Sequence, residues 1–257
     1  MSKKIASGAD KIVLDVKVGS GAFMKNKADA IKLAETMVRI GQLVGRETVA
    51  VLTSMEEPLG VAIGNSLEVK EAIEVLSGRG EPALKEVCLV LGSHMLVLGG
   101  KAPTPEVARS QLNELINNKQ ALAKFSEFIS AQGGEAGVVN NTANLPQARY
   151  ALDVTTGCQG YIKTIDTAQI GYAAMRLGAG REYKGQAIDL AAGVIIKCRI
   201  GQYIGQDQLL ATIYSNDDSH LEQAALIIKQ AIRIDPQYVA KPPLIIGFVT
   251  KNGFVID

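Results

Sequence analysis

The sequence has no tryptophan, only three cysteines and no long uninterrupted apolar run. The cysteine pattern argues against a disulfide-rich or zinc-binding protein, and the short apolar runs argue against a membrane-spanning one. Cys88, Cys158 and Cys198 form no CxxC motif and no cysteine–histidine cluster with metal spacing, so neither a disulfide framework nor a structural zinc site is expected. No stretch reaches the ~18 to 20 apolar residues of a membrane helix, and the first residues lack the layout of a signal peptide. We therefore expect a cytoplasmic protein with reduced thiols and no membrane partner.

Neither sign of charge is in excess. Lysine and arginine total 27 against 26 aspartate and glutamate residues, which leaves a formal net charge of +1. A balance this close to neutrality gives no extended field that would attract a nucleic acid or an acidic membrane surface. We expect no nucleic-acid partner, and a small-molecule substrate fits the composition better.

Aliphatic side chains must fill the interior, because hydrophobic residues make up 47% of the chain while aromatic residues make up only 5%. A core of alanine, valine, isoleucine and leucine is typical of α/β folds. With 257 residues the chain can bury a sizeable core in one or two domains. We expect two.

The sequence begins with a strand, helix, strand pattern. Ile12-Val13-Leu14 and Val16 form a short apolar run that suits a strand covered on both faces. Apolar residues then recur at helical spacing over 25–44, and residues 47–54 are again strand-like. This βαβ unit predicts a parallel pair of strands with a right-handed crossover.

Helices are predicted to follow this unit. Asn65 is expected to cap a helix that ends at Gly78, and a second helix begins near Pro82. Thr104, followed by a proline, is expected to cap a third helix. Glycine, asparagine, alanine and threonine crowd without periodicity over 133–146, so the main domain boundary is placed there.

The rest of the chain predicts a unit of mixed strands and helices. Strands are expected over 161–166, within 187–213 and over 244–250, and helices over 168–177 and 220–234. The predicted fold class is α/β, with a mixed, largely parallel sheet flanked by helices. A smaller α+β C-terminal domain with sandwich-like strands is expected to follow it.

Four blocks of sequence occur in an order and at a spacing that resembles one enzyme family. They are Ser2-Lys3-Lys4, DVKVGSGAFM over 15–24, SMEEPLG-x-AIGNSLEV from Ser54, and DxxxGxxIxxRIGxxIxxxQxLATIYS from Asp189. Each block alone is weak. In this order they resemble pyrimidine nucleoside phosphorylases and the closely similar thymidine phosphorylases over essentially the whole chain. The likeness is to the C-terminal part of such an enzyme.

The resemblance implies a domain organisation. Residues 1–10 are expected to be the remnant of a small helical domain, 11–146 the C-terminal portion of the α/β phosphorylase domain, and 147–257 the α+β C-terminal domain. In such enzymes the helical domain carries the dimer contacts and moves to close on substrate. The full-length protein is therefore expected to be a homodimer.

The resemblance also implies an activity, the reversible phosphorolysis of a pyrimidine nucleoside. Inorganic phosphate attacks the sugar C1′, which releases the pyrimidine base and an α-linked ribose or deoxyribose 1-phosphate. No organic cofactor is implied, and no catalytic residue is assigned in this chain. We expect the chain to be inactive alone, because the glycine-rich phosphate segment and the base-binding arginine of such enzymes lie upstream.

Lys3, the first lysine of the SKK block, matches the family lysine that contacts the pyrimidine base. The departing base must leave as an anion or be neutralised, so a cation on its carbonyl oxygen stabilises the transition state more than the bound substrate. Composition alone would favour a solvated lysine near a chain end. The family match favours the substrate-binding interpretation.

Leu59, Ala62 and Glu71 match positions that bind a monovalent cation in bacterial members of the resembling family, and potassium is the expected ion. Two main-chain carbonyls and one carboxylate are the oxygen donors that hard cations prefer. From spacing alone, the alternative is an ordinary loop followed by a surface glutamate. The three residue types match, so a potassium site is expected, and the resemblance implies that its remaining ligands lie in the upstream part of such enzymes.

Two other motifs have competing interpretations. Gly19 to Gly21 could cradle phosphate through main-chain N–H groups, but a lone G-x-G after a strand is weak, and a structural turn is favoured. The segment around Lys197 resembles half of a lipoyl- or biotinyl-type sandwich, although it lacks the residues that flank an attachment lysine. Two other functions stay open, a noncatalytic binding or assembly fragment and a related phosphoribosyltransferase.

Overall fold

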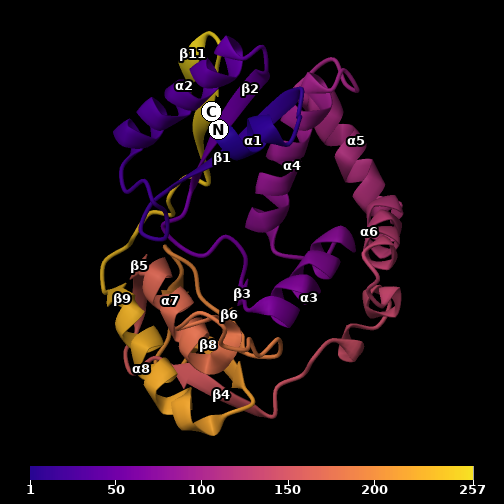
Figure 1. Cartoon of the computed structure of the whole chain (residues 1–257). Helices are drawn as coiled ribbons and strands as arrows, with labels where there is room; N and C mark the ends of the chain where they lie inside the picture. The colour runs from indigo at the N-terminus through magenta and orange to yellow at the C-terminus, as the bar shows by residue number, and fades with distance from the viewer. Residues whose placement is uncertain (257) are drawn as a thin grey trace. The chain divides into compact units, whose positions relative to one another are not determined.

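The computed structural model describes residues 1–256, which divide into two compact units. Unit 1 consists of Met1–Met55, Pro82–Asn118 and the chain from Pro243 onward, whereas unit 2 consists of Glu56–Glu81 and Lys119–Pro242. Most helices and strands of both units are labelled in Figure 1. Each unit therefore combines segments that lie far apart in the sequence.

A four-stranded mixed sheet organises unit 1, in the order β1-β2-β10-β11. Strands β1 (Lys11–Val18) and β2 (Glu47–Ser54) pair in parallel, with Lys11 opposite Glu47 and Val18 opposite Ser54. Strand β10 (Ile245–Thr250) pairs antiparallel with both β2 and β11 (Gly253–Val255). The predicted α/β class and mixed sheet are confirmed, and the parallel pairing is the one that belongs to the βαβ unit.

Four helices belong to unit 1. They are α1 (Ser2–Ala6), α2 (Lys27–Leu43), α4 (Pro82–Leu98) and α5 (Pro105–Asn117). Helix α2 begins where the Asn26 side chain accepts a hydrogen bond from the Asp29 N–H at 2.9 Å. Its buried face of Ala30, Ala34 and Val38 packs in one cluster with the strand residues of β1 and β2. Small residues on this face allow the helix to approach the sheet closely.

Unit 2 contains two antiparallel sheets, β3-β6-β8-β4 and β7-β5-β9. The strands are β3 (Ala62–Ile63), β4 (Tyr150–Thr155), β5 (Gly160–Ile165), β6 (Gly193–Ile196), β7 (Tyr203–Ile204), β8 (Leu209–Ser215) and β9 (Ile232–Asp235). The helices are α3 (Asn65–Leu76), α6 (Gln120–Ala131), α7 (Thr167–Ala174), which continues as a π-helical turn over Met175–Ala179, and α8 (Leu221–Ala231). Short 3-10 turns occupy Ala136–Val139, Thr142–Asn144 and Asp218–His220.

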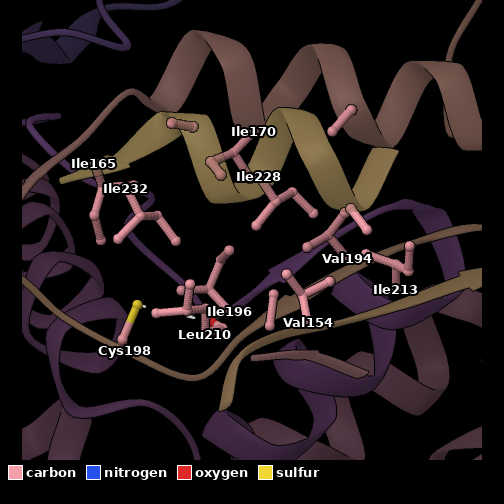
Figure 2. Packing of buried hydrophobic residues seen from close by; sticks show 14 of the residues in the cluster. Val154, Ile165, Ile170, Val194, Ile196, Cys198, Leu210, Ile213, Ile228 and Ile232 are labelled. Carbon is pink, nitrogen blue, oxygen red and sulfur yellow. Dashed lines mark hydrogen bonds between the residues drawn. The ribbon is translucent and has the colours of Figure 1, made fainter. Parts of the chain in front are cut away.

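The core of unit 2 lies between these strands and the helices α7 and α8, as Figure 2 shows. Ile170 of α7 and Ile228 of α8 are fully buried against strand residues such as Val194 and Ile213. Cys198 belongs to the same cluster, and burial raises the pKa of its thiol to about 12. This thiol therefore stays protonated and behaves as a small apolar side chain.

Two local predictions are wrong. Asn65 does not cap α3, because Gly64 occupies the N-cap position with a φ of 135°, and the Asn65 side chain instead donates to the Ala179 carbonyl at 3.3 Å. The helix predicted over 220–234 ends at Ala231, and Ile232–Asp235 forms β9. The apolar pattern continued past the helix end because β9 also buries Ile232, now through pairing with β5.

The compact units are built from non-contiguous segments, whereas the predicted domains are the continuous ranges 1–10, 11–146 and 147–257. That division into domains stays a prediction. The last strands join the sheet of unit 1, and the segment Glu56–Glu81 belongs to unit 2. Among the described residues, no helix is long and apolar enough to cross a membrane.

Candidate functional site

Lys3 lies on α1, a helix of one and a half turns in unit 1, and its side chain is exposed. Its carbonyl accepts the main-chain N–H of Ser7 at 3.1 Å, which closes the short helix. A cavity of about 310 Å³ beside this helix is lined by Lys4, Ser7 and residues of β1 and α4, and Lys3 does not line it. The side chain is thus open to solvent.

The glycine loop after β1 is a turn held by main-chain hydrogen bonds. The N–H of Gly19 donates to the Met24 carbonyl at 3.0 Å, and the N–H of Gly21 donates to the Met55 carbonyl at 3.0 Å. Gly19 has a φ of 133°, a conformation that side chains disfavour. Because both N–H groups are engaged by carbonyls, the structure supports a turn and not a phosphate cradle.

The three predicted cation ligands come from one continuous part of unit 2. Leu59 lies in the loop before β3, Ala62 begins β3, and Glu71 lies in the middle of α3. The Glu71 carboxylate turns back to this loop, where it accepts the main-chain N–H of Val61 at 2.6 Å. A further hydrogen bond comes from the Ala62 main chain. The structure therefore brings the glutamate and the loop together.

Gly60 explains how the carboxylate approaches the loop so closely. A Cβ atom at this position would lie 2.1 Å from Glu71 Oε2 and 2.7 Å from its carboxyl carbon, which is closer than atoms can pack. Only a residue without a side chain leaves this space free. The carboxylate consequently lies against the main chain between the two predicted carbonyl ligands.

Burial dominates the electrostatics of this glutamate. Glu71 is 6% exposed, and burial raises the pKa of its carboxyl above the ordinary value of 4.5, while hydrogen bonds from Val61 and Ala62 and the charge of Arg199 oppose the rise. A buried carboxylate without a full counter-charge favours a nearby cation. This preference is independent of any likeness to other proteins.

An arginine that the sequence reasoning did not assign also contacts this loop. The Arg199 guanidinium donates to the carbonyls of Pro58 and Leu59, the latter at 3.2 Å, and lies 3.3 Å from a carboxylate oxygen of Glu81. The neighbouring main-chain N–H of Ile200 donates to the Glu57 carboxylate at 2.7 Å. Hydrogen bonds therefore join two of the quoted sequence blocks, through EEPLG in one and RIG in the other. Their joint presence was the signal that could have identified this pair.

The donor chemistry of the loop fits a monovalent cation. Carbonyl oxygens and one carboxylate are hard ligands that suit potassium or sodium, and they do not suit zinc, which prefers nitrogen and sulfur. Within the described residues no group of three or more histidine, cysteine, aspartate or glutamate side chains could hold a metal. The described part of the chain thus offers oxygen donors at this loop and no cluster of metal-binding side chains.

Comparison with known proteins gives matches over most of the chain. A family model described as "Glycosyl transferase family, a/b domain" matches residues 1–122, and one described as "Pyrimidine nucleoside phosphorylase C-terminal domain" matches residues 161–235. The two matches together include all four sequence blocks quoted above.

Curated relatives match over nearly the whole chain. The pyrimidine-nucleoside phosphorylase of Bacillus subtilis (strain 168) is 48% identical over 251 residues, which covers 98% of this chain and 58% of the relative. The enzymes of the same name from Geobacillus stearothermophilus and Staphylococcus aureus (strain USA300) are each 47% identical, over 95% and 98% of this chain and 56% and 58% of their own lengths. The chain thus spans little more than half the length of these relatives.

Proposed function

The chain belongs to the pyrimidine-nucleoside phosphorylase family, and from this premise we propose that it contributes to the phosphorolysis of pyrimidine nucleosides. The observation that carries the proposal is 48% identity over 98% of the chain to a relative of that name. In the proposed reaction the phosphate oxygen forms a bond to the sugar C1′ while the bond from C1′ to the base nitrogen breaks. The electron pair of the broken bond leaves with the pyrimidine, which is uracil or thymine.

Lys3 is proposed to bind the pyrimidine base. Its exposed ammonium group on α1 can reach a carbonyl oxygen of a bound base, where negative charge accumulates as the C1′ bond breaks. A cation placed at that oxygen stabilises the transition state more than the ground state. The residue thereby lowers the barrier without forming a bond to the substrate.

A monovalent cation, potassium in the first instance, is proposed to bind the carbonyl oxygens of Leu59 and Ala62 and the carboxylate of Glu71. The burial of Glu71 and its contacts with the Val61 and Ala62 main chain support this assignment. When bound, the ion would neutralise the carboxylate and fix the loop between β2 and β3. Its proposed role is structural, and it takes no part in bond making.

The active assembly is proposed to be a homodimer that includes residues equivalent to the part of the relatives outside the match. The matched region covers 58% of the Bacillus subtilis relative. The chain alone is therefore proposed to have no turnover, and no organic cofactor is required.

A phosphorolysis assay tests the proposal. Uridine, thymidine and deoxyuridine are each incubated with phosphate and the chain, alone and mixed with the N-terminal part of the Bacillus subtilis relative. We expect free base and pentose 1-phosphate from the mixture alone. Base release from none of the nucleosides, with a mixture shown by light scattering to have assembled, would contradict the proposal. Turnover that requires a sugar diphosphate donor would identify a phosphoribosyltransferase instead.

A further inference from the structure

Arg199 contacts the loop over 56–62, which contains the two proposed carbonyl ligands of the cation. Its guanidinium donates to two consecutive carbonyls, those of Pro58 and Leu59. The side chain is largely buried, with 18% of its surface exposed. We propose that Arg199 is a positioning residue that sets the direction of the Leu59 carbonyl toward the cation. This inference rests on the proposed cation site.

The planar guanidinium suits this task. Two N–H groups of one rigid fork bind neighbouring peptide carbonyls, so the relative orientation of the two peptide planes is fixed together with the side chain. A carbonyl oxygen has two lone pairs. The Leu59 oxygen can therefore accept the N–H of Arg199 at 3.2 Å and still present a lone pair to an ion.

Arg199 is itself held from two sides. Glu81 pairs with the guanidinium at 3.3 Å, and Gln202 accepts the main-chain N–H of Arg199 at 3.1 Å. The next residue, Ile200, donates its N–H to Glu57, which stands directly before Pro58. The loop and the RIG turn are consequently joined by contacts on both the side chain and the main chain.

The carboxylates near Arg199 outnumber the positive charges there, so a second cation can bind beside this arginine. Glu81 pairs with the Arg199 guanidinium, and the charge of Arg199 also acts on the carboxylates of Glu57 and Glu71. Lys241 adds a second positive charge that acts on Glu57, so three carboxylates face two cations. A monovalent ion and Arg199 can therefore coexist.

A simple alternative is that Arg199 competes with the ion through charge repulsion. The two roles predict opposite effects of substitution. If Arg199 positions the carbonyl, Arg199→Lys and Arg199→Gln both weaken potassium binding, because neither retains the planar fork. If it only repels the ion, Arg199→Gln strengthens binding and Arg199→Lys leaves it unchanged.

The test uses two measurements on the chain. The first is amide hydrogen exchange over residues 56–62 in choline chloride, which reports loop order without potassium. The second is a titration of thermal stability with potassium chloride at constant ionic strength, with choline chloride as the balancing salt. Arg233→Lys, at an exposed arginine on β9, is the matched control, and far-UV circular dichroism verifies that each variant is folded.

We expect exchange over 56–62 to accelerate about tenfold in Arg199→Lys and in Arg199→Gln, and the potassium concentration at half-maximal stabilisation to rise about tenfold, a range typical of residues that orient metal ligands. Unchanged exchange, or tighter potassium binding in Arg199→Gln, overturns the inference. If potassium stabilises the wild type no more than choline does, both in the chain alone and in its assembly with the N-terminal part of the Bacillus subtilis relative, the cation site is wrong. Accelerated exchange in the variants would then show only that Arg199 orders the loop.

A second variant covers the case in which Arg199→Lys does not fold. Glu81→Gln leaves the guanidinium in place and removes one of its two supports. We expect a smaller effect of the same sign, about threefold in both measurements, because the carbonyl contacts remain. No change in either measurement would count against the positioning role.

Discussion

The carboxylate of Glu71 accepts the main-chain N–H of Val61 at 2.6 Å, across ten positions of the sequence. This contact joins the middle of α3 to the loop before it, and Gly60 provides the space for it. A buried acid is thus held against main-chain groups and not against another side chain.

Replacement of Glu71 by glutamine is expected to abolish stabilisation by potassium. The amide keeps the shape and one acceptor oxygen but carries no charge, so the proposed ion loses its only carboxylate ligand. For the wild type, a potassium concentration one hundred times Kd should add about 2.7 kcal/mol to the free energy of unfolding. Urea unfolding in potassium chloride and in choline chloride measures the difference. Glu68→Gln, at an exposed position of the same helix, should respond to potassium as the wild type does.

The stability contributed by Glu71 should decrease as pH rises. Burial raises the pKa of Glu71 in the folded state, so the folded chain binds this proton more tightly than the unfolded chain. The protonated form therefore favours folding, and that advantage is lost as pH rises from the ordinary value of 4.5 through the raised value.

This pH dependence is measured as the difference in unfolding free energy between the wild type and Glu71→Gln, in choline chloride at several pH values. The difference should shift against the wild type as pH rises, and potassium should reduce the shift because it neutralises the carboxylate. A difference that is flat with pH, or one that favours the wild type at higher pH without potassium, would contradict the assignment.

Gly60→Ala should destabilise the loop. The added methyl group would lie 2.1 Å from Glu71 Oε2, so the carboxylate must move away from the Val61 N–H. Overpacking of this kind costs about 1 to 3 kcal/mol, and the response to potassium should fall as well. Gly205→Ala is the matched control, because a methyl group there meets nothing within 4 Å. Equal stability of the two variants in thermal melts would show that the carboxylate is not held as described.

Lys3→Gln should lower kcat/KM for uridine by about 10²- to 10³-fold in the assembled enzyme, the usual effect of removing a group that stabilises developing negative charge. Steady-state phosphorolysis with the reconstituted protein measures it. Lys4→Gln, at the adjacent exposed lysine, should leave the rate near that of the wild type. If both variants lose activity equally, a general effect of positive charge at α1 explains the result, and the specific role of Lys3 is wrong.

Much of the fold could be predicted because local patterns and tertiary contacts agree. The periodicity over 25–44 matched α2, and the proline signals matched the starts of α4 and α5. The end of α8 was missed because an apolar stripe does not show where a helix gives way to a paired strand. The N-cap at Asn65 was missed because an asparagine can equally bond a distant carbonyl, here that of Ala179.

The candidate site was only partly accessible from the sequence. Leu59, Ala62 and Glu71 were predicted from the family resemblance. Every residue has a main-chain carbonyl, so the residue type does not reveal which carbonyl binds an ion. Arg199 lies 140 positions from Leu59, and no periodicity or local motif connects residues at such a separation. Only the folded structure shows that Arg199 of the RIG turn contacts the loop carbonyls of Pro58 and Leu59.

The order of strands in the sheet of unit 1 has a consequence for synthesis on the ribosome. Strand β2 has β1 on one side and β10 on the other, and β10 begins only at Ile245. Until the ribosome has made those late residues, one hydrogen-bonding edge of a strand that is almost wholly buried in the native fold has no native partner. The nascent chain therefore passes through a stage at which β2 is open to aggregation, and truncation before Ile245 would make that stage permanent.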